Sequence, residues 1–193
     1  TQTRCKKLSS IYGLQINYRT DIQNEIECIS SAMPQAKGAC VFEKEYERNC
    51  KMSTKDECQK MLSNGTEFHE GFLCSAESLN TICGPRGGTT CVEGKDEVYF
   101  LDTCGNLANV YDFSKLNNSV YWEKITAPTC NNGLGNKGSA TCGNCDYYSG
   151  STCKKGNANY GNFICKDLKC TYEGKIYQHG ETWCATDTGN EKT

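Results

Sequence analysis

Histidine, methionine and tryptophan are scarce in this chain of 193 residues, which has two, three and two of them respectively. Long apolar runs are also missing: none approaches the roughly 18 residues that a helix needs to cross a bilayer, so we expect no membrane span. The net charge is −2, and lysine and arginine are scattered rather than gathered on a basic face. Nucleic acid is therefore excluded as an expected partner.

The apolar content is low for a domain of this size. The hydrophobic share of 37% includes the cysteines, and the mean hydropathy is −0.65. Such a chain buries less apolar surface than an ordinary domain, so another interaction must offset the entropy lost on folding.

Cysteine is the residue that the chain has in excess, with 16 copies. A disulfide typically contributes about 2–4 kcal/mol by constraining the unfolded chain. Cysteines in such numbers persist as disulfides in oxidising compartments, so we predict a secreted or cell-surface location. The chain begins with Thr1 rather than Met, as expected if a signal peptide has been removed or if the chain is a segment of a longer product. We expect disulfides at Cys5, Cys28, Cys40, Cys50, Cys58, Cys74, Cys83, Cys91, Cys104, Cys130, Cys142, Cys145, Cys153, Cys165, Cys170 and Cys184.

The cysteines divide evenly between the two halves of the chain, eight in 1–91 and eight in 92–193. Each half could close its disulfides internally, and the connector "CGPRGGTTC" is rich in turn-forming residues. We therefore place a soft boundary near residue 92, between a cysteine-rich segment with short helices and a β-hairpin domain. One continuous domain is the alternative.

Helical signals gather in the first half. Thr20 and Gln23 match a capping box, Ser53 and Thr54 begin a second short helix over "DECQKML", and Ser75 can cap a third of about two turns. Helices this short are marginal alone, and a cysteine on the inner face of each suggests that disulfides pin them.

The second half has the signals of antiparallel hairpins. In "DEVYFLDTCGNLANVYDF" two extended runs meet around Cys104-Gly105-Asn106. Near the end, Glu173-Gly174 is predicted to turn one hairpin and His179-Gly180 a second. The expected fold is α+β and disulfide-rich, with short helices in the N-terminal half and hairpins in the C-terminal half.

One cysteine pattern could bind a metal. Cys142 and Cys145 form the only CxxC, and with Cys165 and Cys170 they could bind zinc if the thiols stayed reduced. A redox role would place the CxxC at a helix N-terminus, whereas it lies in a glycine-rich loop. The oxidising context favours structural disulfides, so we predict no metal and no cofactor.

No catalytic constellation is recognisable. His69 and His179 have no nucleophile motif around them. Asp102, Asp112 and Glu123 lie on or near predicted strands, where solvated faces are expected. We predict a non-enzymatic protein and no catalytic residues; a secreted hydrolase using unmarked carboxylates is the alternative.

Two features point to the surface of an exported protein. Asn64 and Asn117 begin N-glycosylation sequons. Aromatic residues crowd the C-terminal half, where they could stack on sugars, form a protein interface or pack over disulfides. Of these, Tyr177 and Trp183 are the predicted binding residues. The crowded aromatics are Tyr147, Tyr148, Tyr160, Tyr172, Tyr177 and Trp183.

Two stretches of sequence resemble known proteins. "CTYEGKIYQHGETWC" (170–184) is similar to the start of a von Willebrand factor type C module, although the clustered cysteines that complete that module are missing. More widely, "KGACVFEKEYERNC", "CVEGKDEVYFLDTCGNLANVYD", "TCGNCDYYSGSTC" and "HGETWC" resemble cysteine-rich exported proteins of small-genome, symbiotic (DPANN-type) archaea. That resemblance implies an outer-surface location and supplies no catalytic residues.

These observations predict a non-enzymatic structural or adhesive protein of the cell surface, for example the subunit of a filament or sheath. Its partners would be further copies of itself, other surface proteins or glycans. The alternative is a secreted module that binds a glycan or a protein.

Overall fold

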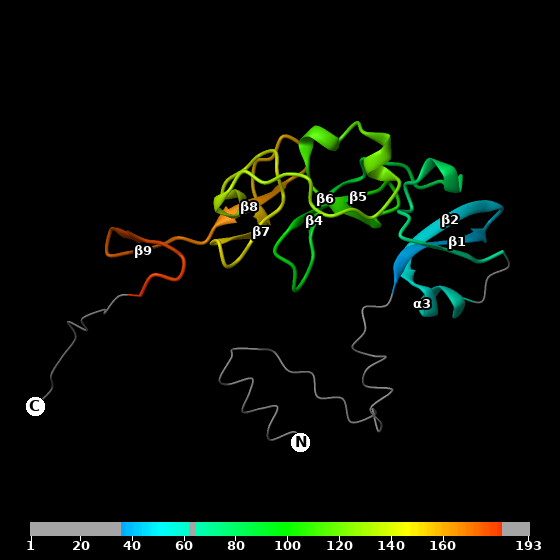
Figure 1. Ribbon diagram of the computed structural model, residues 1–193, viewed down its shortest axis with the longest axis horizontal. Coiled ribbons are helices and arrows are strands. Elements are labelled where there is room, and N and C mark those ends of the chain that lie inside the picture. The colour runs from blue at the N-terminus through cyan, green and yellow to red at the C-terminus, as the bar shows by residue number, and fades with distance from the viewer. Residues whose placement is uncertain (1–35, 62–64, 183–193) are drawn as a thin grey trace, which may run out of the picture. The chain divides into compact units, whose positions relative to one another are not determined.

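The computed structural model describes residues 36–61 and 65–182, all within one compact unit of the chain (Figure 1). The helix predicted after Thr20 lies outside these residues. So do five of the predicted site residues, namely Cys5, Cys28, Asn64, Trp183 and Cys184.

The first sheet has three antiparallel strands in the order β2-β1-β3. They are β1 (Lys37–Lys44), β2 (Glu47–Thr54) and β3 (Glu67–Glu70). The middle strand β1 is buried over Ala39, Cys40 and Val41. At Gly38 an added Cβ would lie 2.1 Å from the carbonyl oxygen of His69, so the close approach of β3 requires glycine there.

The prediction of an α+β fold with a helical first half is wrong. The described part of that half is mainly β-structure, and its only α-helix is the short α3 (Lys55–Gln59). The predicted start of α3 is confirmed, because Thr54 accepts from the backbone N–H of Glu57 and the Glu57 carboxylate accepts from that of Thr54. The described residues thus form small antiparallel sheets with one helix and isolated 3-10 turns.

The third predicted helix is a single 3-10 turn, η1 (Glu77–Leu79). The Ser75 hydroxyl does not cap it, because it donates 2.8 Å to the carbonyl oxygen of Trp122. Asn80 then ends the turn in the left-handed conformation. The Ser75 hydroxyl, which was expected to cap a helix, therefore forms a tertiary hydrogen bond instead.

The second sheet has the order β4-β5-β6, and all its pairs are antiparallel. Its strands are β4 (Gly88–Cys91), β5 (Val98–Leu101) and β6 (Leu107–Val110). The predicted hairpin between β5 and β6 is confirmed. Its turn is fixed by the buried Asp102 carboxylate, which accepts from the backbone N–H groups of Cys104 and Asn106.

Two further pairs of strands complete the β-structure. β7 (Ser151–Lys155) pairs with β8 (Phe163–Asp167), and β9 (Cys170–Tyr172) pairs with β10 (Lys175–Tyr177). The predicted turn at Glu173-Gly174 is confirmed, with φ of 49° and 77°. His179-Gly180 also forms a turn, but no further strand follows it as far as residue 182.

The remaining regular elements are 3-10 turns, η2 (Phe113–Lys115), η3 (Ser119–Trp122) and η4 (Leu134–Asn136). Among the residues described, no helix has the length and apolar character of a membrane span.

The buried hydrophobic residues of the described ranges form two clusters. The aromatic core packs around Phe100, whose ring centroid is 4.9 Å from that of Trp122 and 5.2 Å from that of Tyr111. The second cluster lies under the first sheet and consists of small aliphatic residues and cysteines.

The prediction of a disulfide-rich fold is confirmed by six disulfides among the described residues. They are Cys40–Cys58, Cys50–Cys74, Cys83–Cys104, Cys91–Cys153, Cys130–Cys142 and Cys145–Cys165. Exposed Cys170 forms no disulfide with another described cysteine.

The two halves of the chain are joined across residue 92. Cys83–Cys104 and Cys91–Cys153 both cross that position. Asn106 adds a polar contact, because its amide donates to the carbonyl oxygen of Cys50 and accepts from the backbone N–H of Met52. The hydrogen bonds of Asn106 thus link the β5–β6 turn of the second sheet to strand β2 of the first, and the two disulfides join the chain covalently across residue 92.

Candidate functional site

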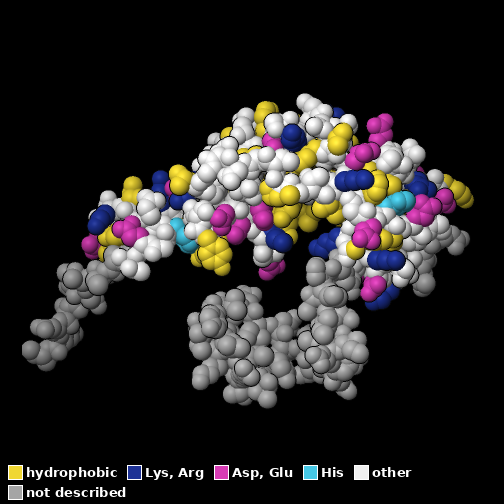
Figure 2. All heavy atoms as spheres, in the orientation of Figure 1, with side chains coloured by type: hydrophobic (Ala, Val, Ile, Leu, Met, Phe, Trp, Pro, Cys, Tyr) yellow, Lys and Arg dark blue, Asp and Glu magenta, His cyan; other side chains and the backbone are white. Residues whose placement is uncertain are grey.

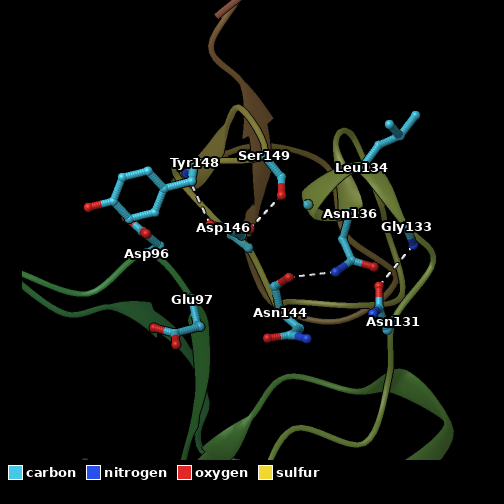
Figure 3. A pocket seen from close by; sticks show the side chains of 12 residues that line it. Asp96, Glu97, Asn131, Gly133, Leu134, Asn136, Asn144, Asp146, Tyr148 and Ser149 are labelled. Atoms are coloured by element: carbon cyan, nitrogen blue, oxygen red, sulfur yellow. Dashed lines mark hydrogen bonds between the residues drawn. The ribbon is translucent and has the colours of Figure 1, made fainter. Parts of the chain in front are cut away.

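A polar hollow of about 560 Å³ lies where three loops meet (Figure 3). The loops are 96–97, 131–136 and 144–149. The residues that line the hollow are Asp96, Glu97, Asn131, Gly133, Leu134, Gly135, Asn136, Asn144, Cys145, Asp146, Tyr148 and Ser149.

The buried amide of Asn136 connects two of these loops. Its Oδ1 accepts from the backbone N–H of Asn132 at 2.6 Å, and its Nδ2 donates to the carbonyl oxygen of Asn144 at 2.5 Å. Gly135 has φ of 61°, and an added Cβ would lie 2.8 Å from Ser151 Oγ, so the turn requires glycine. This wall of the hollow is fixed by contacts within the protein.

The second wall is the turn 146–149, organised by the Asp146 carboxylate. Its oxygens accept from the backbone N–H of Tyr148 at 3.0 Å and from Ser149 Oγ at 2.5 Å. The hydrogen bond from Ser149 is the main cause that lowers the pKa of Asp146. Asp146 is therefore a carboxylate at neutral pH.

The third wall carries Asp96 and Glu97. Asp96 Oδ2 accepts from the backbone N–H of Tyr147 at 3.0 Å, which joins this loop to the turn 146–149. Glu97 Oε2 accepts from the Tyr99 hydroxyl at 3.2 Å. Burial, and then the Glu97 charge, raise the pKa of Tyr99 to about 12.

The hollow has a negative character. Among the described residues that line it, three are carboxylates and none is a lysine or an arginine. Asp96, Glu97 and Asp146 form no ion pair with a described residue, while Lys137, next to Asn136, is 4.0 Å from Asp167. Elsewhere on the face drawn in Figure 2, acidic and basic side chains are interspersed.

Two apolar side chains stand at the rim. Tyr148 is 93% exposed and Leu134 is 80% exposed, and they lie on opposite sides of the hollow in Figure 3. The neighbouring Tyr147 ring contacts His179, with ring centroids 4.5 Å apart. The hollow thus combines hydrogen-bonding walls with an aromatic ring open to solvent.

Tyr177, one of the two residues predicted to bind a partner, does not line the hollow. Tyr177 is 8% exposed and has Lys175 Nζ 5.2 Å from its ring centroid, so burial leaves little of its ring for a partner. Trp183 lies outside the described residues. Of the two sequons, Asn117 is exposed.

Sequence reasoning missed the hollow itself. The sequence places Tyr147 and Tyr148 only in a group of aromatic residues, and Cys142 and Cys145 only in a glycine-rich loop. The available signal was the density of asparagine and glycine between cysteines, which predicts tight, fixed turns. Nothing in the sequence indicated which loops would meet.

The predicted alternatives for chemistry find little geometric support. Cys142, Cys145 and Cys165 are all in disulfides, so they are not available as zinc thiolates. No cluster of three or more metal-binding side chains occurs in residues 36–61 and 65–182. Asp102 and Asp112 are buried and hydrogen-bonded within the protein, the latter to Ser114 and Thr129.

Comparison with known proteins yields no relative: no family model matches the chain, and no curated protein or solved structure matches it.

Proposed function

We propose that this chain is a non-enzymatic, extracellular adhesive module that binds carbohydrate in the hollow. A small disulfide-rich fold is compatible with an extracellular module. The observation that carries the finer assignment is the exposed Tyr148 ring beside a hollow lined by carboxylate and amide groups.

The chemistry of the walls suits sugar hydroxyls. Carboxylates accept hydrogen bonds, and asparagine amides both donate and accept them. A sugar ring also has a C–H face, which packs on an aromatic ring while its hydroxyls stay wet. Tyr148 and the polar loops would supply the two kinds of contact from one side of the ligand.

The fixed loops favour binding. The disulfides Cys130–Cys142 and Cys145–Cys165 anchor the segments on which two of the walls lie. The hydrogen bonds of Asn136 and Asp146 order the turns before any ligand arrives. A preorganised site loses less conformational entropy on binding, which matters for ligands as weakly held as sugars.

The charge of the hollow sets an expected preference. Asp96, Glu97 and Asp146 repel sulfated sugars and uronic acids, because no basic side chain lines the hollow to compensate. Neutral sugars and sugars with an amino group are therefore the expected ligands.

A glycan array and calorimetry with its best ligand would test the proposal. Tyr148→Ala should weaken binding about fivefold, since it removes an aromatic contact worth on the order of 1 kcal/mol. Tyr46→Ala is the matched control, because Tyr46 is fully exposed at the β1–β2 turn, remote in sequence from the hollow. An array without hits, or equal affinity for both variants, would contradict the proposal.

Self-assembly into a filament or sheath is a second candidate. The β9–β10 pair stands as a two-stranded sheet, and all three residues of β9 are exposed, as is Ile176 of β10. Exposed strand edges can pair with other chains. Electron microscopy should then show polymers that Ile176→Lys disperses; monomers under all conditions would count against this candidate.

A further inference from the structure

The turn before η3 carries the sequon Asn117-Asn118-Ser119, which the proposed function does not use. Asn117 is exposed, and Asn118 fixes the turn by accepting from the backbone N–H of Tyr121 at 3.2 Å. N-glycans attach to the side-chain nitrogen of asparagine in such surface segments.

The Asn117 amide is oriented by a neighbour. Arg86 Nη1 donates to Asn117 Oδ1 at 3.0 Å, and Asn117 Nδ2 makes no hydrogen bond with a described residue. Arg86 is itself positioned, because its carbonyl oxygen accepts from the Tyr160 hydroxyl at 2.6 Å. The folded protein thus binds the oxygen of this amide and leaves open the nitrogen that a glycan would use.

A groove of about 500 Å³ begins beside this sequon. Ser119 is part of the sequon and also lines the groove, and the adjacent Val120 is 72% exposed. The groove runs on to Pro85, next to Arg86, and to Asn80. An isolated valine beside hydroxyl and amide groups matches the mixed surface of a sugar ring.

We propose that Asn117 carries an N-linked glycan, that Arg86 holds its amide oxygen, and that the first sugars cover Val120 and the groove. In the transfer, Asn117 Nδ2 bonds to the anomeric carbon of a lipid-phosphate-linked oligosaccharide. The C–O bond to that phosphate breaks, the lipid phosphate leaves with the electron pair, and Nδ2 gives up one proton. The attached sugar leaves Oδ1 free to keep its bond from Arg86.

This modification is independent of ligand binding in the hollow. The full chain, secreted by a host that glycosylates sequons, would be analysed by intact mass and peptide mapping. We expect glycan mass on the peptide that contains Asn117, its loss in both Asn117→Gln and Ser119→Ala, and its retention in Ser119→Thr. An unmodified Asn117 in the folded, secreted chain would overturn the proposal.

The position of the first sugars has its own readout. Amide exchange would be compared between the glycosylated chain and the same chain after enzymatic removal of the glycan. Slower exchange over 80–85 and 119–123 in the glycosylated chain supports a glycan lying in the groove. Equal exchange in these segments contradicts that placement. Enzymatic removal of the glycan converts Asn117 to aspartate, so unglycosylated Asn117→Gln serves as the control for the added charge.

Discussion

The first sheet and the aromatic core differ in the side chains that they bury. Under the first sheet the buried residues are small, and disulfide cysteines supply much of the cluster. The core beneath the second sheet contains Phe100, Tyr111, Tyr121 and Trp122, with disulfides packed against it. Aromatic side chains bury about 150–250 Å² each, so far more apolar surface leaves water in the second region.

The difference shows that cross-linking is not equally important along the chain. In the first sheet, removal of the disulfides would leave Ala39, Val41, Ala76 and Leu79, with the partly buried Met52 and Phe72, to offset the entropy of folding. In the aromatic core, packing and disulfides act together. We therefore expect the two regions to respond differently to core mutation and to reduction.

The largest expected effect is on the aromatic core. Phe100 is fully buried and contacts four other aromatic rings, so Phe100→Ala should lower the free energy of unfolding by about 3–5 kcal/mol. Denaturant titration measures the change. Phe113→Ala is the control, because Phe113 is 37% exposed and its truncation should cost much less; equal losses would argue against a dominant aromatic core.

Removal of one disulfide should have a local effect in the first sheet. Replacing Cys50 and Cys74 by alanine should cost about 2–4 kcal/mol and speed amide exchange in β1 and β2. The same change at Cys91 and Cys153 opens a longer loop, with a sequence separation of 62 against 24. In this control the amides of β5 and β6 should stay protected from exchange, because aromatic packing also stabilises them. Faster exchange in β5 and β6 would argue against the difference between the two regions.

A smaller effect is expected at the start of α3, which carries Cys58. Thr54→Ala removes the cap and should cost about 1 kcal/mol, whereas Thr54→Ser should keep most of it. The bonds from Thr54 lower the pKa of Glu57 below its usual 4.5, so their stabilisation is present above pH 4.5 and is lost as the pH falls through the lower folded value. Unfolding measured against pH should lose part of this acid dependence in Thr54→Ala.

At the hollow, the expected effect is a change in the pKa of one residue, Tyr99. Glu97→Gln should lower the pKa of Tyr99 from about 12 but leave it above its usual 10.0, because burial is the larger cause. The raised pKa means that Tyr99 stabilises the fold below pH 10 and that this contribution is lost as the pH rises toward 12. NMR of labelled tyrosine measures the pKa. An unchanged pKa of Tyr99 in Glu97→Gln would show that Glu97 does not lie near Tyr99 in solution.

The least disruptive test concerns Cys170. With all 16 cysteines in disulfides, intact mass should rise by about 16 Da on reduction, against about 12 Da for six disulfides. Peptide mapping should then place Cys170 with Cys5, Cys28 or Cys184. A free thiol at Cys170 in the folded chain would contradict the prediction of complete pairing.

Local signals with strong geometry could be predicted from the sequence. Cys104-Gly105-Asn106 and the pair Glu173-Gly174 are turn sequences, and both turns are present. Asp102, expected on a solvated face, is instead buried beneath the first of these turns. The capping box at Thr54 was also found, because it depends on residues only three positions apart. Such features need no information about the rest of the fold.

The first sheet could not be predicted in the same way. Its β1–β2 turn uses Glu45 and Tyr46 with φ of 55° and 66°, a conformation that normally selects glycine or asparagine. Residues that favour turns are absent there, so the hairpin had no visible signal. The pairing of β1 with both neighbours stabilises it, and Asn49 Nδ2 donates to the carbonyl oxygens of Lys44 and Glu47 beside the turn.

The hollow depended on information that sequence does not contain. Its walls are 96–97, 131–136 and 144–149, which are joined by the hydrogen bonds of Asp96 and Asn136 and lie beside the disulfides Cys130–Cys142 and Cys145–Cys165. Within even one half of the chain, eight cysteines allow about 105 pairings. Tyr177 shows the converse limit, because it was predicted to bind a partner while the fold buries it.

Amide exchange along the fully reduced chain, held in reductant under native buffer conditions, tests most directly whether the first sheet depends on disulfides more than the aromatic core does. Strands β1, β2 and β3 should exchange at nearly the rates of an unfolded chain, while β5 and β6 retain measurable protection around Phe100. Equal loss of protection in both sheets, or better protection in the first, would contradict the account.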